Sequence, residues 1–272
     1  SVNYSSPKMA TAKDIHVAPI SQRDAAALVK RIHYSKQSAI NANLHLGVFL
    51  DGNLEGVMQF GSSLQKSSTI KLVSDTGWNG FLELNRMAFS DKLPRNSESR
   101  ALGVAFRLIK KHYPHIEWVV SFADGTQCGD GTIYRASGFV LTQVKQNSTM
   151  HELPDGTVFA DVGLRASSSK LREKIGFKLG TPFSKFKEES GAKRIQGFQL
   201  RYIYFLNPAA RARLTVPVLP FSKIADMNAG MYKGEKITRT KGQALEYPSS
   251  LGGLTPTRSL QTPAEDATQA EA

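Results

Sequence analysis

The chain has 272 residues, of which 40% are apolar and 9% aromatic, and this composition excludes a disordered protein and allows a sizeable buried core. Its single cysteine excludes an internal disulfide, no apolar run is long enough to cross a bilayer, and the polar N-terminus lacks a secretory signal core. The formal net charge of +12 favours polyanionic partners. We therefore expect a soluble intracellular protein that does not engage a membrane.

The N-terminal third alternates short strands with one helix. Residues 14–20 predict a strand, and residues 21–33 predict a helix with an apolar face. Two apolar segments within 44–60 flank a glycine turn at Gly52 and predict a β-hairpin. Residues 62–78 are polar, which indicates a long connection or an irregular strand.

The middle of the chain continues this alternation. The predicted elements are a strand over 81–89, a helix that begins at Asn96 or Ser97 and ends before Pro114, a strand over 118–122, a short helix over 132–137 closed by Gly138, and a strand from 139 to 144. This order predicts an α/β fold with a mixed, mostly antiparallel central sheet and helices on both faces.

The last third has weaker patterns. Asp155-Gly156 resembles a hairpin turn, residues 165–178 predict a basic helix, and residues 198–206 predict a strand. From about Gly234 the chain has no periodicity, so we expect a disordered or surface-draped tail. The expected organisation is a flexible N-terminus (1–13), a catalytic domain (14–233) and this tail (234–272).

Basic residues concentrate in one segment. From Gly163 to Lys223 there are thirteen lysines and arginines against three acids. A basic surface can serve solubility alone, but this concentration favours contact with nucleic acid. The DNA-binding candidates are Lys185, Lys187, Lys193, Arg194 and Arg201. Three phenylalanines in this segment, Phe183, Phe186 and Phe198, could insert between bases, although such residues more often belong to a core.

Two strand ends could carry chemistry. Residues 89–100 lead from a strand into a helix whose N-terminus suits a phosphate, and Arg95 and Arg100 strengthen that preference. Residues 121–124 end a buried strand, and ligands of open α/β sheets bind beyond such ends. Asp124 could there act as a base or a metal ligand, or Asp124-Gly125 could be an ordinary turn.

Tyr134 precedes Gly138-Phe139 on a short helix, and this arrangement resembles the N-acetyltransferase (GNAT) superfamily. In that superfamily such a tyrosine often protonates the departing coenzyme A thiolate. A helical tyrosine can equally be half-buried packing. The usual pyrophosphate loop contains glycines, whereas the equivalent stretch here, Arg95 to Arg100, contains none, so coenzyme A either does not bind or binds with altered geometry.

Four segments in the same order resemble a narrower group, the phage Mom family. They cover residues 83–86, 93–99, 119–124 and 131–136, and later similarity lies at 201–206 and 217–220. The resemblance extends over roughly residues 30 to 223. It implies a GNAT-like enzyme in the host cell cytoplasm that converts adenine in double-stranded DNA to an N6-carbamoylmethyl derivative and so protects phage DNA from restriction.

The resemblance also implies site residues and cofactors. Acetyl-CoA or a related acyl donor and iron are the implied cofactors, with Arg86 and Ser99 as candidates for binding cofactor or substrate. The implied metal ligands are His33, Tyr34, Asp124 and Tyr134, a nitrogen and oxygen set that suits iron. The catalytic candidates are Ser121, Asp124 and Tyr134, and the cofactor-binding candidates are Arg86, Arg95, Asn96, Ser99 and Arg100. Tyr134 cannot easily be both proton donor and metal ligand in one step.

Two other functions stay open. The chain could be a GNAT acyltransferase that acts on a small amine or a protein, or a DNA-binding protein without catalytic activity on a GNAT-like scaffold. The long basic segment favours DNA over a small amine, which needs only a basic pocket. We expect double-stranded DNA as the partner and leave a homodimer open. Because the reactive atom lies inside the duplex, the enzyme must extrude the base.

Overall fold

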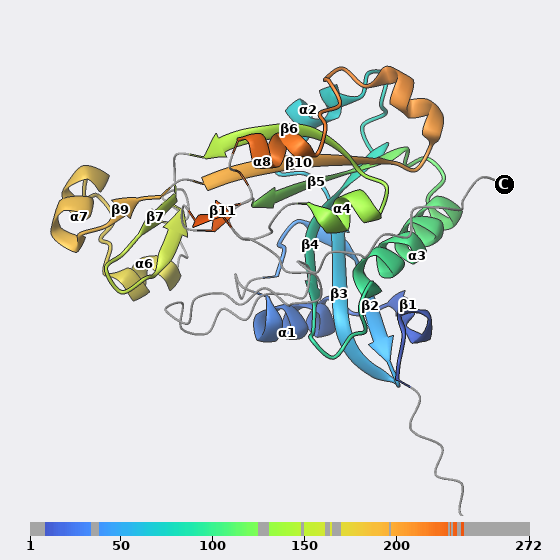
Figure 1. Cartoon of the computed structure of the whole chain (residues 1–272), viewed down its shortest axis with the longest axis horizontal. Coiled ribbons are helices and arrows are strands. Elements are labelled where there is room, and N and C mark those ends of the chain that lie inside the picture. The colour runs from blue at the N-terminus through green and yellow to red at the C-terminus, as the bar shows by residue number, and fades with distance from the viewer. Residues whose placement is uncertain are drawn as a thin grey trace, which may run out of the picture.

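The computed structural model describes residues 9–33, 38–124, 131–147, 150–160, 164, 170–195, 197–227, 229, 231–232 and 235–236. Tyr34 and nearly all of the predicted tail lie outside these residues. A seven-stranded sheet forms the centre of the molecule, and a smaller group of strands and helices projects from one end of it (Figure 1).

The main sheet is mixed and mostly antiparallel, as predicted. Its strands, in spatial order, are β1 (His16–Pro19), β2 (Ala42–Leu50), β3 (Asn53–Gly61), β4 (Phe81–Phe89), β5 (Trp118–Asp124), β10 (Gly197–Phe205) and β6 (Val140–Asn147). All neighbours pair antiparallel except β4 and β5, which pair parallel. The predicted hairpin is confirmed as β2 and β3, which turn at Asp51-Gly52.

Helices cover both faces of this sheet. The helical elements are η1 (Ala12–Asp14), α1 (Gln22–Ile32), α2 (Lys66–Thr69), η2 (Ile70–Leu72), α3 (Ser97–His112), α4 (Thr132–Ala136), η3 (Pro208–Arg213) and α8 (Ser222–Asp226). Neighbouring residues of β3 point to opposite sides, so Val57 packs under α1 and Met58 packs under α3. The segment 62–78, predicted as a long connection or an irregular strand, is a connection from β3 to β4 that contains α2 and η2, and its Leu72 and Val73 pack with Phe81 and Trp118.

Strands β4 and β5 pair over a short length only. The register joins Phe81–Glu83 to Trp118–Val120, and no further β4–β5 pair is present in the described part of the chain. Both strands continue beyond this point, β4 to Phe89 and β5 to Asp124. We call the paired end near Phe81 the closed end of the sheet and the unpaired end near Asp124 the open end.

A lobe with its own core is inserted between β6 and β10. It spans 150–195 and contains β7 (Met150–Glu152), β8 (Val158–Ala160), α6 (Lys170–Ile175), α7 (Phe183–Ser190) and β9 (Lys193–Arg194). Its strands form the order β8-β7-β9, and the buried residues of its apolar core are Phe159, Leu164, Phe186 and Ala192. The predicted turn at Asp155-Gly156 joins β7 to β8. A further pair, β11 (Met231–Tyr232) and β12 (Glu235–Lys236), lies outside the lobe.

The predicted basic segment is therefore divided between two parts of the molecule. Its first half belongs to this inserted lobe, and its second half, from Gly197, belongs to the main sheet and the chain that follows it. Of the predicted helix over 165–178, the described residues show α6 (Lys170–Ile175), which is followed by Gly176 with a left-handed φ of +73° that ends it. Residues 165–169 lie outside the described residues.

The inserted lobe adjoins the open end. The chain leaves the sheet at Asn147 and returns at Gly197, and these two residues face each other across β6 and β10. Two residues further on, Gln199 pairs with Asp124 on one side and Lys145 on the other. The lobe thus begins beside the last residue of β5, and in Figure 1 it projects from the end of the sheet at which β6 ends and β10 begins.

Among the described residues, no helix is both long and apolar enough to span a membrane.

We predict that the inserted lobe unfolds locally when its core is truncated. Phe186 is 6% exposed and contacts residues of the lobe core, so Phe186→Ala should cost about 3–5 kcal/mol of local stability. Hydrogen exchange should accelerate in 150–195 and stay slow in β2–β5. Phe198→Ala, in the main core, is the matched control and should destabilise the sheet. Equal loss of protection in both parts after Phe186→Ala would contradict the separate core.

Candidate active site at the open end of the sheet

A hydroxyl pair lies where α4 crosses β5. Ser121, which is 1% exposed, donates a hydrogen bond from its Oγ to the hydroxyl oxygen of Tyr134 over 3.0 Å. The Tyr134 ring stacks on Tyr202 with centroids 4.1 Å apart and an interplanar angle of 4°. Since Tyr202 is also the β10 residue that pairs with Ser121, strand register and ring stacking place the three side chains together. The structure thus brings two of the three predicted catalytic residues into contact.

The turn into α4 requires glycine. Gly131 is the N-cap of α4 with a φ of +76°, and a Cβ at this position would collide with the hydroxyl of Tyr202. A left-handed φ and a close approach to a neighbour are the two conditions that only glycine meets easily. Gly131 thereby lets Tyr134 lie flat against the strand.

Asp124, the third predicted catalytic residue, is the last residue of β5. It pairs with Gln199 and lies three positions after Ser121 on the same strand. The backbone therefore places it at the open end, next to the inserted lobe.

The N-terminus of α3 forms the second predicted feature. Asn96 is the N-cap with a left-handed φ of +67° and makes no side-chain cap, whereas the Ser97 hydroxyl donates to the Pro94 carbonyl over 2.6 Å. Arg95 and Arg100 are exposed on either side of this turn. Asn96 thus supplies the left-handed backbone for which glycine is the usual residue, since asparagine tolerates this conformation. This turn fits an anionic group, although buried Glu98 reduces the local positive charge.

A row of buried polar groups crosses the other face of the sheet. Gln59 is fully buried, and its Oε1 accepts from the backbone N–H of Ala39 over 3.2 Å. That contact fixes the amide, so Nε2 faces the Nδ1 of His45 at 3.1 Å and donates to it. Burial lowers the pKa of His45, which favours the neutral ring that this bond requires. The sequence analysis missed both residues, although a glutamine and a histidine inside apolar strands were the available signal.

Arg86 continues this row on β4. It pairs with Gln59 across the β3–β4 ladder, two residues from Ala88, which packs under α1. Within the described part of the structure, the Arg86 Nε is buried without a hydrogen-bond partner. On β5 the side chains of Val119, Ser121 and Ala123 point to the same face, because side chains alternate along a strand. Val119 and Ala123 pack on the α3 side of the sheet, so Ser121 faces that side too. Arg86 and Ser121 therefore belong to opposite faces, and a single ligand could reach both only through the open end.

A carboxyl group lies near the start of the unpaired stretch. Burial raises the pKa of Glu83, and hydrogen bonds from Ser63 and Asn85 partly offset this effect. Asn85 is the extra residue of a bulge, since Gln59 pairs with Arg86 while Phe60 pairs with Leu84. Like the Arg86 Nε, its Oδ1 is buried without a partner among the described residues.

The predicted metal ligands are only partly placed. His33 is buried at the C-terminal end of α1, and Tyr134 contacts Ser121. Tyr34 lies outside the described residues, and the structure describes Asp124 only by its backbone. In the described ranges no group of three histidine, cysteine, aspartate or glutamate side chains could hold a metal ion. The iron site stays a prediction from the sequence.

The five predicted DNA-binding residues fall into two environments. Lys185, Lys193 and Arg194 are exposed on the inserted lobe, and Lys187 lies over the Phe183 ring at 5.5 Å. Arg201 is half-buried in β10, where its Nε donates to the Thr142 hydroxyl over 2.9 Å. Burial lowers the pKa of Arg201. Among the phenylalanines, Phe186 is in the lobe core and Phe198 is in the main core.

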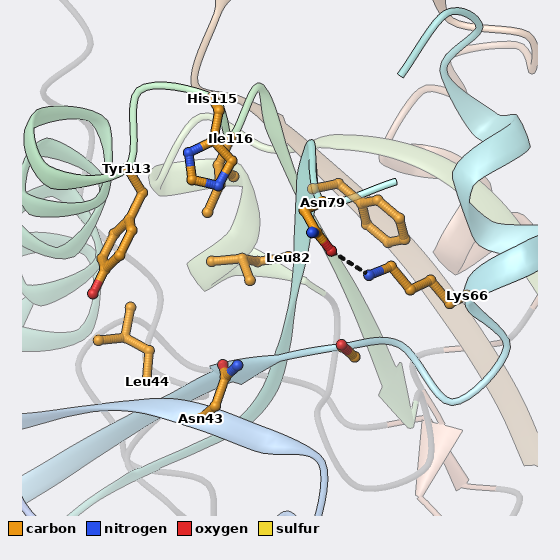
Figure 2. Close-up of a pocket in the computed structure, with 10 residues that line it drawn as sticks. Asn43, Leu44, Lys66, Asn79, Leu82, Tyr113, His115 and Ile116 are labelled. Atoms are coloured by element: carbon orange, nitrogen blue, oxygen red, sulfur yellow. Dashed lines mark hydrogen bonds between the residues drawn. The ribbon is translucent and has the colours of Figure 1, made fainter. Parts of the chain in front are cut away.

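A pocket of about 420 Å³ opens at the closed end, away from these residues (Figure 2). It lies between the starts of β2 and β4 and the loop that precedes β5. Its lining residues are Asn43, Leu44, Ser62, Lys66, Asn79, Phe81, Leu82, Tyr113, His115 and Ile116. Lys66 donates to the Asn79 Oδ1 over 3.0 Å and covers the Trp78 ring at 4.7 Å. None of the residues predicted for catalysis or binding lines this pocket.

Comparisons with solved structures give weak similarities to acetyltransferases. The ribosomal-protein-S18-alanine N-acetyltransferase from Escherichia coli aligns with a TM-score of 0.40 and 9% identity, over 71% of this chain and 94% of that chain. An acetyltransferase from Bacillus subtilis in complex with CoA aligns with a TM-score of 0.39 and 11% identity, over 70% of this chain and 97% of that chain.

Sequence comparisons are much stronger. The methylcarbamoylase mom of Escherichia phage Mu is 39% identical over 215 residues, which cover 78% of this chain and 85% of that protein. The model of the Mom protein family matches residues 14–223, a range that includes the main sheet and the inserted lobe. The chain therefore belongs to the Mom protein family.

Proposed function

We propose that this protein modifies duplex DNA by converting adenine to an N6-carbamoylmethyl derivative, and that the modification protects phage DNA from restriction in the host cytoplasm. The observation that carries this proposal is the 39% identity to a phage Mu protein whose name is methylcarbamoylase. The geometry supports it, because the Ser121–Tyr134 hydroxyl pair lies at β5, the strand whose last residue adjoins the basic lobe.

The inserted lobe is proposed to hold the DNA. Its edge strand β9 consists of the exposed cations Lys193 and Arg194, and Lys185 is exposed on α7. Exposed cations bind phosphates without regard to sequence. Since the lobe begins beside Asp124, DNA bound there would present its bases to the open end.

Tyr134 is proposed as the group that donates a proton during transfer. Ser121 donates to its hydroxyl oxygen and stacking on Tyr202 fixes its ring, so the phenol group is held in a defined position. Asp124 is proposed as the base that removes a proton from the adenine amine, since it ends β5 at the same edge.

An acyl-CoA or a related donor is proposed to carry the transferred group. Formation of the N6–CH2 bond requires that the methylene carbon, already bearing its carboxamide, leaves its carrier; Tyr134 would protonate the departing carrier while Asp124 takes the N6 proton.

The exposed Arg95 and Arg100 and the left-handed turn at Asn96 would hold the donor's phosphates at the start of α3. Ser99 and Arg86 would complete the contacts, with Arg86 reaching the ligand from the α1 face.

The proposal is tested by mass spectrometry of nucleosides from plasmid DNA of cells that express the protein. A modified deoxyadenosine with the mass of the carbamoylmethyl adduct should be present with the wild-type protein and absent with Asp124→Ala. Unmodified DNA in cells that contain soluble wild-type protein would contradict the proposal and favour acyl transfer to a small amine.

We predict that Tyr134→Phe and Ser121→Ala separate catalysis from binding. Loss of the donated proton should lower modification about 100-fold or more, because Tyr134→Phe removes the hydroxyl and Ser121→Ala removes its hydrogen bond. Affinity for duplex DNA should stay within about twofold, since neither side chain is placed to contact phosphates. Tyr113→Phe, at the closed end, is the matched control. Full modification by Tyr134→Phe would remove Tyr134 from the catalytic set.

We predict that the β9 cations set the salt dependence of DNA binding. Replacing Lys193 and Arg194 with alanine should weaken binding at every sequence and lower the slope of log K against log salt by about 0.9 for each phosphate that is no longer neutralised. The control pair Lys110→Ala and Lys111→Ala removes the same charge from the last turn of α3. An equal effect from both pairs, measured by titration at several salt concentrations, would show that net charge alone attracts DNA.

A further inference from the structure

A leucine is exposed on the connection between α6 and α7. Leu179 is 63% exposed. The Thr181 N–H donates to the Lys178 carbonyl over 3.1 Å and closes a four-residue turn with Leu179 and Gly180 at its corners. Gly180 has a φ of +88°, the value that the third position of a type II turn requires. Leu179 therefore occupies the first corner of a tight and well-defined turn.

The residues before this turn fix it to the lobe core. The Phe177 ring packs edge-on against Phe186 at a centroid distance of 5.1 Å, and its N–H donates to the Arg172 carbonyl over 3.0 Å. Phe177 thus anchors the connection while Leu179, two residues later, extends into solvent. Burying an exposed leucine is worth about 1.5–3 kcal/mol, so Leu179 offers a partner a rigidly presented apolar group.

The surroundings of Leu179 suit a polyanion. Lys178 is exposed immediately before it. Four residues after it α7 begins, with no acid in its first turn, so the positive end of the helix dipole is not neutralised there. Lys185 lies exposed on the same helix and pairs loosely with Glu189 at 3.7 Å. This arrangement, an apolar residue flanked by cations, is suited to a protein that binds DNA phosphates and inserts an apolar side chain between base steps.

Leu179 also differs in position from four other exposed apolar residues. Ile40, Leu64, Trp78 and Tyr113 belong to the closed end of the sheet, near the start of β2 and the end of β3, which pairs with the start of β4. Leu179 lies on the lobe that begins beside Asp124. It is thus the exposed leucine on the part of the molecule that adjoins the candidate catalytic residues.

We propose that Leu179 is the wedge that enters the duplex and occupies the space left by the base that the enzyme extrudes. The inference rests on the proposed modification of duplex DNA. Leu179 takes this role in place of Phe186 and Phe198, whose rings are buried, and of Phe183, which is partly buried against the lobe core. Opening one base step costs a few kcal/mol, and a leucine that fills the gap offsets part of that cost.

Permanganate footprinting tests the wedge without requiring the donor. Permanganate attacks thymines that have lost their stacking, so the thymine opposite an extruded adenine becomes reactive on a plasmid-length duplex. The full-length wild-type protein should create such sites. Leu179→Ala should lower their reactivity about tenfold while duplex affinity stays within about twofold. Leu64→Ala, the same substitution at a residue that is 79% exposed at the closed end, should behave as the wild type.

The outcomes separate this inference from the proposed function. Wild-type thymine reactivity in Leu179→Ala would overturn the wedge and leave the modification of DNA intact. A wild-type protein that modifies deoxyadenosine in cells but creates no reactive thymine would also overturn the wedge. Absence of both duplex binding and modified deoxyadenosine with the wild-type protein would overturn the proposed function and the wedge with it.

Discussion

The pairing of β4 with β5 at one end only is the constraint on which the candidate site depends. At the closed end the Phe81 and Trp118 rings stack 4.4 Å apart, and the Trp118 Nε1 donates to Thr76 over 3.0 Å. Glu117, just before β5, forms an ion pair with Arg213. These contacts hold the two parallel strands together where they start.

Beyond Glu83 and Val120 β4 and β5 no longer pair, so polar side chains from both faces of the sheet can contact a ligand at the open end. Arg86 comes from the α1 face, and Ser121 with Tyr134 comes from the α3 face. If β4 and β5 were paired along their whole length, the unbroken sheet would separate Arg86 from Ser121 and Tyr134, and no single ligand could contact both faces. The end of strand pairing removes that barrier, so the chemistry proposed for this family member depends on a backbone feature as much as on any side chain.

The strand and helix order could be predicted from the sequence because periodicity and caps report it directly. The hairpin at Gly52, the helix after Ser21 and the strand that ends at Asp124 are all present. The inserted lobe could not be predicted, because its strands have only two or three residues and show no alternation. Its separate core consists of contacts between residues far apart in the chain, which a single sequence does not reveal.

The candidate site divides in the same way. Tyr134 and the start of α3 lie on local motifs that the sequence displays. Contact between Tyr134 and Ser121 depends on the register of β5 with β10 and on a glycine at position 131 that admits Tyr202. Gln59 and His45 were missed because each lies in an apolar strand, and only the cross-strand register shows that Gln59 pairs with His45 on one side and with Arg86 on the other.

DNA is proposed to bind at the open end, across the inserted lobe. Hydrogen exchange of the full-length protein with and without duplex DNA tests it most directly. We predict slower exchange in 170–195 and 131–136 on binding, and unchanged exchange in 66–79 and 110–116 around the pocket of Figure 2. Protection confined to the pocket residues, with the inserted lobe unaffected, would contradict the account.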